Sequence, residues 1–240
     1  MVFDADVLLD RIDDATGQLL ATAAGLGDAD VRRPSLLPDW SRRHVLTHLA
    51  RNADGGLRLM GWARTGVAAQ EYPSPAARAA EIEAGAGRRA AELLADLRDS
   101  ADRFAAEYRR MPSSAWEVTV RWTRGQEHRA ARIADSRLAE VLLHHVDLDA
   151  GFGCAQWPPD FVRDLLGRVV ASFRARADAP AVRLLATDTG ECHEPAPGDR
   201  QAPTVAGPQA ELLGWLTGRS DGAGLDQRGA AALPALPPLY

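Results

Sequence analysis

Hydrophobic residues recur at helical spacing along most of the first 150 residues of the chain. Residues 4–24 carry apolar side chains at alternating spacings of three and four, which is typical of one apolar helix face. A second helix is predicted after Ser41, its expected N-cap, and its apolar face extends to Met60. A third is predicted over 76–111 and a fourth over 134–150. Four helices in this order predict a four-helix bundle.

The third of these stretches contains Gly85 and Gly87. Each glycine weakens a helix by about 1 kcal/mol relative to alanine, so we expect one long helix that is locally weakened. Glycine at these positions would also admit a neighbouring helix or a bound ligand. Between the third and fourth helices, residues 116–128 alternate between apolar and polar for a few positions, which predicts a short extended excursion.

The pattern changes near residue 150, and the remainder predicts a small α/β domain. Its expected elements are a helix (160–177), a strand that leads into a turn (180–191), one short strand within 195–207, a helix from Pro208 to Gly218, and an extended tail (234–240). Proline suits the first turn of a helix and glycine suits its end. The sequence therefore predicts two domains, a bundle over 1–152 and a small α/β domain over 153–240.

Composition narrows the classes of function. The chain has 46% hydrophobic residues, 25% charged residues and a net charge of −5, which argues against a nucleic-acid-binding protein. Cys154 and Cys192 are too far apart for a CxxC motif, so a disulfide scaffold or a cysteine-based zinc site is not expected. No apolar stretch reaches the length of a membrane span, and the N-terminus is acidic where a signal peptide is basic. We expect a cytoplasmic monomer.

Two histidines and one glutamate are candidate metal ligands. Glu140 and His144 are four residues apart in a segment without a helix breaker, so on a helix both side chains lie on one face. His48 lies far upstream, in the second predicted helix. Two imidazoles and a carboxylate from two helices can bind one divalent ion, zinc being the expected one, and leave positions free for a substrate. The pattern therefore predicts a metalloenzyme.

Spacing alone leaves other interpretations open. His44 forms a competing pair with His48, and His145 is a further single candidate. A histidine at the edge of a helix core is commonly a hydrogen-bonded core residue rather than a ligand. Asn52 and Asp147 lie about one helical turn from the candidate ligands, so either could orient a ligand. Asn52 is also expected to contact a small-molecule cofactor bound beside the metal.

Three segments resemble the mycothiol-dependent maleylpyruvate isomerase family, which belongs to the DinB-like metalloenzyme superfamily. They are LPDWSRRHVLTHLARNADG, SRLAEVLLHHVDLDAGFG and VAGPQAELLGWLTGRSDG, in matching order over nearly the whole chain. The resemblance implies a mainly α fold, a DinB-like four-helix bundle followed by a small α/β C-terminal domain. The segments 61–76 and 112–128 match only loosely, and they lie where a substrate pocket is expected.

The resemblance also implies roles for individual residues. By this likeness, His48, Glu140 and His144 are the metal ligands. Arg219 resembles an active-site arginine that the second domain contributes, and its planar guanidinium would grip a substrate carboxylate. From the residues alone, Arg219 is equally well a solvated charge near the end of a helix.

Mycothiol is the cofactor that the resemblance implies. A cation beside a sulfur lowers the pKa of the thiol, so a bound divalent ion would hold the thiolate. In the isomerase that thiolate adds to the conjugated cis double bond of maleylpyruvate. The resulting single bond rotates, and the thiolate leaves to give fumarylpyruvate.

Two alternatives to the isomerase remain. A mycothiol S-transferase would use the same ion and thiol but would retain the conjugate with its electrophilic substrate. A non-catalytic metal- or thiol-binding module would close the metal with a fourth protein ligand, whereas an enzyme keeps one position open. The expected partners are mycothiol and a small molecule that carries a carboxylate or an electrophilic double bond.

Overall fold

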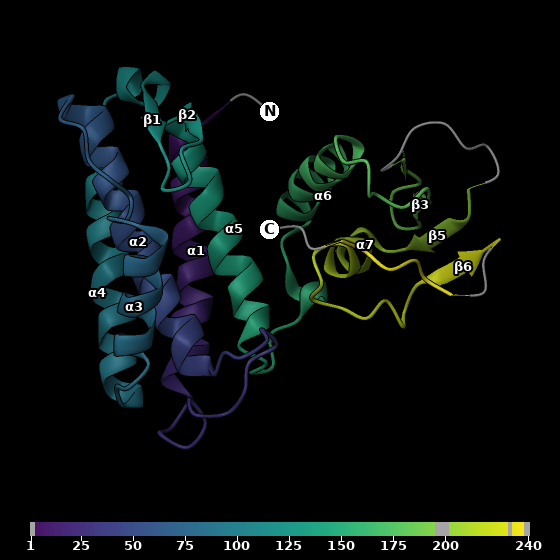
Figure 1. The fold of residues 1–240 in the computed structure, drawn as a ribbon, viewed down its shortest axis with the longest axis horizontal. Helices are drawn as coiled ribbons and strands as arrows, with labels where there is room; N and C mark the ends of the chain where they lie inside the picture. Colours follow the sequence, from purple (N-terminus) through teal and green to yellow (C-terminus); the bar gives the residue numbers. More distant parts are fainter. Residues whose placement is uncertain (1–2, 195–201, 230–231, 238–240) are drawn as a thin grey trace. The chain divides into compact units, whose positions relative to one another are not determined.

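The structure, a computed structural model, describes residues 3–194, 202–229 and 232–237. The chain packs as two compact units, Met1–Ala150 and Gly151–Tyr240 (Figure 1). The described part is mainly helical with a small sheet in the second unit, which confirms the predicted fold class. None of the described helices is both long enough and apolar enough to cross a bilayer.

Four long helices form the bundle of the first unit. They are α1 (Ala5–Ala24), α2 (Arg42–Thr65), α4 (Ala90–Arg109) and α5 (Ala131–Asp147). Helices α1 and α2 each contact both α4 and α5, so the four enclose a common core (Figure 1). Each helix contributes a large side chain that is no more than 1% exposed: Leu19, Leu49, Phe104 and Leu142. The predicted four-helix bundle is confirmed.

Helix α2 begins where the sequence predicts, with Ser41 as its N-cap. The main-chain N–H of Ser41 donates to His44 Nδ1 at 3.1 Å, and the Ser41 hydroxyl lies 2.8 Å from the same nitrogen. The imidazole of His44 thus takes the place that a glutamate has in a capping box. This cap fixes the first turn of α2 and, with it, the position of His48 one turn further along.

The prediction of one long helix over 76–111 is wrong. The chain forms a short helix α3 (Pro75–Gly85), breaks, and begins α4 at Ala90. At the break α3 meets α2 so closely that a Cβ built on Gly85 would lie 2.3 Å from Thr47 Cγ2. The glycine therefore admits a neighbouring helix, which is one of the two roles that the sequence suggested for it.

The extended excursion before α5 is confirmed as a small hairpin. A 3₁₀ turn (Ser113–Glu117) leads into β1 (Thr119–Arg121), which pairs antiparallel with β2 (Glu127–Arg129). Val120 of β1 is fully buried, and the flanking strand positions are exposed. Helix α5 follows directly, three residues earlier than the predicted start at 134.

The second unit combines two helices with a four-stranded sheet. Its elements are a 3₁₀ turn (Cys154–Gln156), α6 (Pro159–Arg174), β3 (Arg183–Ala186), β4 (Cys192–His193), β5 (Thr204–Gly207), α7 (Gln209–Leu216) and β6 (Asp226–Arg228). The strand order is β4-β3-β5-β6, with β3 and β5 parallel and both edges antiparallel. Helices α6 and α7 contact each other. The sequence predicted β3 and β5 but not β4 and β6, which are too short for a periodic signal. Of the predicted tail, 234–237 carries no regular element, and 238–240 lies outside the described residues.

Helix α7 ends in a motif that fixes the main chain at Arg219. Gly218 has a φ of 74° and its N–H donates to the carbonyl oxygen of Trp215, while the N–H of Arg219 donates to that of Gly214. This pair of hydrogen bonds is a Schellman motif, for which glycine is the favoured residue because of its positive φ. The predicted end of this helix at Gly218 is confirmed.

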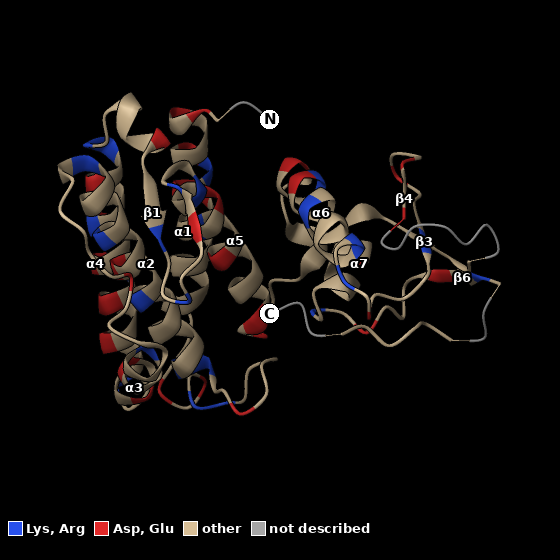
Figure 2. Cartoon of the chain, turned by 45° about the horizontal axis from the view of Figure 1, so that its top comes forward, with Lys and Arg blue, Asp and Glu red and all other residues tan. Residues whose placement is uncertain are grey.

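Acidic and basic residues are interspersed along the helices of the first unit (Figure 2). Many form cross-helix pairs, such as Arg103 with Asp54 at 2.7 Å and Arg51 with Asp96 at 2.6 Å. Pairs near the surface contribute only about 0–1 kcal/mol each, so the apolar core carries most of the stability of the bundle.

The contact between Gly85 and Thr47 gives a prediction for stability. We expect Gly85→Ala to lower the free energy of unfolding by about 1–3 kcal/mol, because the added methyl group overpacks the contact between α2 and α3. The control is Gly61→Ala within α2, where a Cβ would meet nothing within 4 Å. That variant should gain up to about 1 kcal/mol from helix propensity. Urea unfolding measures both, and a Gly85→Ala protein as stable as the wild type would contradict the contact.

Candidate metal centre

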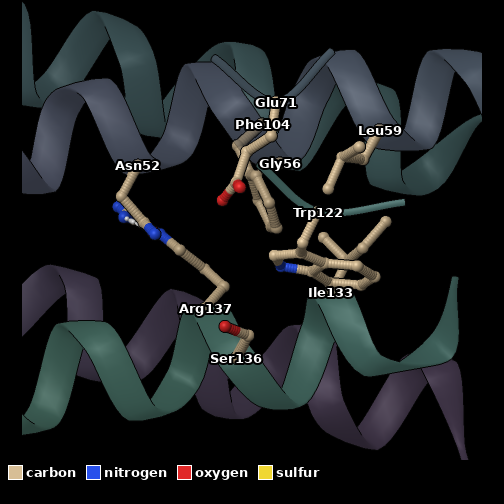
Figure 3. A pocket seen from close by; sticks show the side chains of 9 residues that line it. All are labelled: Asn52, Gly56, Leu59, Glu71, Phe104, Trp122, Ile133, Ser136 and Arg137. Carbon is tan, nitrogen blue, oxygen red and sulfur yellow. Dashed lines mark hydrogen bonds between the residues drawn. The ribbon is translucent and has the colours of Figure 1, made fainter. Parts of the chain in front are cut away.

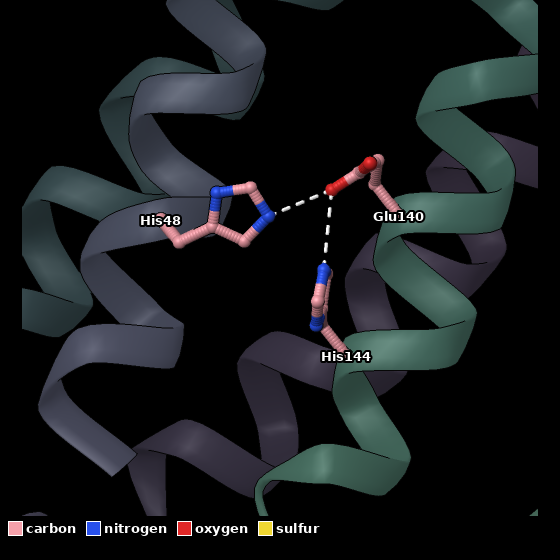
Figure 4. Close-up of side chains that lie close together, drawn as sticks. All are labelled: His48, Glu140 and His144. Atoms are coloured by element: carbon pink, nitrogen blue, oxygen red, sulfur yellow. Dashed lines mark hydrogen bonds and ion pairs between the residues drawn. The ribbon is translucent and has the colours of Figure 1, made fainter. Parts of the chain in front are cut away.

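The three predicted ligands meet between α2 and α5 (Figure 4). One ligand atom from each of His48, Glu140 and His144 lies within 4.8 Å of the other two. His48 Nε2 is 2.7 Å from Glu140 Oε2, and His144 Nε2 is 3.3 Å from the same oxygen. Two imidazole nitrogens and a carboxylate oxygen therefore point at one place, a donor set that suits zinc and similar divalent ions.

Helix geometry explains how these residues come together. Glu140 and His144 are one turn apart on the face of α5 that packs against α2, and His48 faces them from α2. The ring centroids of His48 and His144 are 4.5 Å apart, with the rings edge to face. The side chains of His48 and His144 are 3% and 15% exposed, whereas Glu140 keeps 30%. The site is therefore accessible on the side of Glu140.

The electrostatics of the site favour neutral His48 and an ionised carboxylate. Burial, reinforced by the nearby His144, lowers the pKa of His48 to about 4. Burial alone would raise the pKa of Glu140, but the two imidazoles hold that pKa well below its ordinary value. Burial opposes a charge on His144, yet hydrogen bonds to Asp147 and Glu140 raise its pKa. Protons therefore compete with a metal mainly at His144.

Asp147 orients His144. Its Oδ2 lies 2.7 Å from His144 Nδ1, and its side chain is only 2% exposed. A buried carboxylate on one ring nitrogen aims the other nitrogen at a metal and increases its basicity, an arrangement common in zinc sites. The main-chain oxygen of Asp147 accepts from the N–H of Leu36 at 2.9 Å, which ties the loop before α2 to the end of α5.

The second nitrogen of His48 has a different partner. Arg78 of α3 places its Nη2 2.9 Å from His48 Nδ1. Because a guanidinium only donates, Nδ1 of the neutral ring accepts, and the ring proton sits on Nε2 facing Glu140. A metal bound at Nε2 requires that proton on Nδ1, where it would face the donor of Arg78. Arg78 in this position therefore opposes metal binding.

The competing histidines have structural partners. His44 caps α2 through Nδ1, and its Nε2 lies 3.2 Å from Glu83 Oε2. His145 points toward α1, where its Nε2 lies 2.8 Å from the Thr22 hydroxyl. Burial lowers the pKa of His145 to about 4. Neither imidazole belongs to the cluster of the three predicted ligands.

Asn52 contacts a charged residue rather than a ligand of the cluster. Its Oδ1 accepts from Arg137 Nη1 at 2.9 Å, inside a small cavity between α2 and α5 (Figure 3). Of the two residues that the sequence suggested for orienting a ligand, Asp147 contacts a ligand of the cluster directly. No role was predicted for Arg137 from the sequence, although its spacing of three from Glu140 was an available signal.

Arg219 lies in the second unit, just after α7. Its Nη1 donates to the carbonyl oxygen of Thr217 at 2.7 Å, and its side chain is partly exposed. The role that the resemblance implies for Arg219 stays a prediction.

A helical bundle that gathers two histidines and one carboxylate on facing helices is a common framework for a metal centre. Comparison with known proteins gives the family. Residues 12–149 match the model for the mycothiol maleylpyruvate isomerase N-terminal domain, and residues 156–236 match that for the corresponding C-terminal domain. The chain belongs to the mycothiol-dependent maleylpyruvate isomerase family, as the resemblance predicted.

Solved structures agree with this assignment. A crystal structure of the mycothiol-dependent maleylpyruvate isomerase has a TM-score of 0.91 and 26% identity, and the match covers 98% of this chain and 97% of that one. A histidine-to-alanine mutant of the isomerase matches with the same TM-score and coverage at 25% identity. Among curated protein sequences, none matches the chain significantly. The prediction of an enzyme like the mycothiol-dependent maleylpyruvate isomerases is confirmed.

The cluster gives a prediction for metal content. Purified protein should hold roughly one equivalent of a divalent ion, and His48→Ala or His144→Ala should lose most of it, since each removes one of three ligands. His44→Ala is the control, because His44 lies on the same helix but outside the cluster. Elemental analysis after dialysis measures the outcome. Full metal retention in both ligand variants would exclude this site.

A second prediction concerns Arg78. We expect Arg78→Met to raise metal affinity by about tenfold, since outer-shell partners typically change affinity by that order. Arg58→Met is the matched control: both guanidinium groups lie 5.7 Å from the Tyr72 ring, but Arg58 donates to the carbonyl oxygen of Glu71 instead of to His48. Competition with a chromogenic chelator measures the affinity. An Arg78→Met protein that binds metal more weakly than the control would refute the assigned tautomer.

Proposed function

We propose that this protein is a metal- and mycothiol-dependent cis–trans isomerase that converts maleylpyruvate to fumarylpyruvate. The observation that carries the proposal is the cluster of His48, Glu140 and His144 in a chain of this family. Three protein ligands and an accessible side are what a catalytic metal site needs, since a structural site would close the fourth position. Family membership supports mycothiol as the thiol.

Residues of this chain would bind the metal ion and orient its ligands. His48, Glu140 and His144 would hold a divalent ion, for which zinc fits the two nitrogens and one oxygen. The bound ion would lower the pKa of the mycothiol thiol, and reversible addition of the thiolate to the conjugated double bond would permit rotation. Asp147 keeps His144 Nε2 aimed at the ion by holding Nδ1.

The surroundings of the cluster would limit access of water. The ring of Trp40 lies 5.6 Å from that of His48, on the loop that precedes α2. Tyr72 is 3% exposed, and the guanidinium of Arg78 lies between its ring and His48. Exclusion of water strengthens the interaction between an ion and a thiolate, because the effective dielectric constant is lower.

Arg219 and Asn52 complete the proposed site. Arg219 would bind a substrate carboxylate with its planar fork. Because Arg137 donates to Oδ1 of Asn52, Asn52 would contact the cofactor through its amide nitrogen Nδ2. Both assignments rest on the family resemblance and on position along the chain.

A mycothiol S-transferase is the second candidate function. It would use the same ion and thiol but release the conjugate. A cavity of about 300 Å³, lined by Trp62, Tyr72 and Trp122 among others, lies beside the hairpin. Its aromatic lining would favour an electrophile with an apolar part, larger than a short dicarboxylate.

Product analysis tests the proposal and separates the two candidates. Metal-loaded protein is incubated with maleylpyruvate and a substoichiometric amount of mycothiol. The isomerase predicts many turnovers per thiol, fumarylpyruvate as product and full recovery of free mycothiol. Chelation of the metal should abolish turnover. Consumption of one mycothiol per molecule of substrate would instead identify the transferase. If maleylpyruvate does not react at all, the isomerase function is excluded.

Arg219 gives a separate prediction. Arg219→Ala should leave metal content unchanged but lower kcat/KM for maleylpyruvate by about a hundredfold, because a charge-assisted bidentate contact contributes roughly 1.5–3 kcal/mol. Lysine at this position should restore activity only in part, since it cannot bind a carboxylate through a fork. Arg228→Ala, at an exposed site in the same unit, is the control. Full activity of Arg219→Ala would show that Arg219 does not bind the substrate and is only a charged residue that follows α7.

A further inference from the structure

Arg137 is a buried cation without an ion-pair partner among the described residues, although its guanidinium lies 5.7 Å from the centre of the Phe104 ring. The residue is 2% exposed, and no described carboxylate lies within ion-pair distance of its guanidinium. Its Nη1 donates to the carbonyl oxygen of Leu49 at 2.8 Å and to Asn52 Oδ1 at 2.9 Å, but its buried Nη2 has no partner. An unpaired buried charge destabilises a fold by several kcal/mol, and a single open donor on it marks a place where an acceptor is missing.

Arg137 lines a small cavity together with other residues that carry hydrogen-bond donors. Arg137, Ser136, Asn52 and Trp122 all line it, between α2 and α5 (Figure 3). Among the described residues, none accepts a hydrogen bond from the Ser136 hydroxyl or the Trp122 indole. The cavity has a volume of about 10 Å³, which is room for one oxygen-sized atom. The residues that line this place for one oxygen thus carry three unused donors, one of them cationic.

One carboxylate also lines the cavity, at Glu71. Its Oε2 accepts from the main-chain N–H of Thr123 at 3.2 Å and from the Thr123 hydroxyl at 2.8 Å. Glu71 is thereby tied to the hairpin, and it does not pair with Arg137. Glu71 and Trp122 also line the 300 Å³ cavity beside the hairpin, so the small cavity adjoins a space large enough for the body of a ligand.

The cavity lies next to the candidate metal centre. Arg137 precedes Glu140 by three residues on α5, and Asn52 follows His48 by four residues on α2. Each wall of the cavity is therefore one helical turn, roughly 5 Å, from a proposed metal ligand on the same helix. A short organic acid is therefore long enough to reach from the cavity at Arg137 to the candidate metal centre.

Arg137 keeps its charge in this setting. Burial lowers its pKa to about 10, against the opposing effect of Glu140. A pKa near 10 leaves the guanidinium protonated at neutral pH. The two hydrogen bonds of Nη1 hold the planar guanidinium in place, so Nη2 can donate to an incoming acceptor without losing either of them.

We propose that Arg137 is a substrate-binding residue that takes one oxygen of a carboxylate of the electrophilic substrate into the cavity between α2 and α5. Ser136 and Trp122 donate to the same carboxylate group. The identity of the bound acid as the substrate rests on the proposed function, whereas the carboxylate site itself does not.

Binding of maleate to the metal-loaded full-length protein tests the site. Maleate is a short unsaturated dicarboxylate, and calorimetry with tryptophan fluorescence reports its binding, since Trp122 lines the cavity. Arg137→Met should weaken maleate binding at least tenfold at unchanged metal content. It should leave the melting temperature equal or higher, because the unpaired buried charge is replaced by an apolar chain. Arg132→Met, on an exposed site of the same helix, should bind maleate as the wild type does.

A second variant guards against misfolding of Arg137→Met. Ser136→Ala keeps the cation and should weaken maleate binding several-fold. Mycothiol is then added as a competitor: maleate binding that persists assigns the cavity to the substrate, and displacement of maleate assigns it to the cofactor and overturns the proposal. Unchanged maleate affinity in Arg137→Met and Ser136→Ala also overturns it and leaves a water molecule as the partner of Nη2. If the wild-type protein binds maleate but has no isomerase activity, and the two variants lose maleate binding, the carboxylate site is upheld and only the proposed function is refuted.

Discussion

Packing of α2 against α5 brings His48 within 2.7 Å of Glu140, and the chemistry of the site depends on that contact. Neither helix has a metal site alone, because α5 supplies two ligands and α2 one. The same interface encloses the cavity at Arg137 one turn further along. Elements outside the interface serve it: the Ser41 cap sets where α2 begins, and Leu36 ties the loop before α2 to the end of α5. A change that shifts α2 along α5 by one or more residues would therefore disrupt both the metal-binding cluster and the cavity at Arg137.

Charge is distributed unevenly around this interface. His144 is held by a buried carboxylate, Asp147, whereas His48 faces the guanidinium of Arg78. The two imidazoles therefore contribute differently: one is made more basic, and the other is kept neutral by burial. Arg137, one turn from Glu140 on α5, is a further cation near the cluster. Cations at these positions favour an anionic thiolate and an acidic substrate, in agreement with the proposed reaction.

The bundle and the pair of Glu140 and His144 were predictable because their signals are local, whereas His48 was chosen over His44 only through the family resemblance. Helical periodicity and the spacing of four between Glu140 and His144 can be read directly from the sequence. The sequence indicated a weak point at Gly85 and Gly87 but not a full break, and the close approach of Thr47 to Gly85 from another helix has no signal in the local sequence. Arg78 was missed for the same reason: its contact with His48 forms only when α3 folds against α2. Strands of two or three residues in the second unit are likewise defined by their pairing and not by their own pattern.

The central claim is that the cluster holds a divalent ion that binds the mycothiol thiolate. The most direct measurement is the absorption spectrum of cobalt-substituted protein, because a thiolate bound to Co²⁺ gives a charge-transfer band in the near ultraviolet. We predict that mycothiol produces this band in the wild-type protein and that it is absent from cobalt-treated His144→Ala. If mycothiol binds to the cobalt protein without producing the band, the thiol is not held by the metal and the account is wrong.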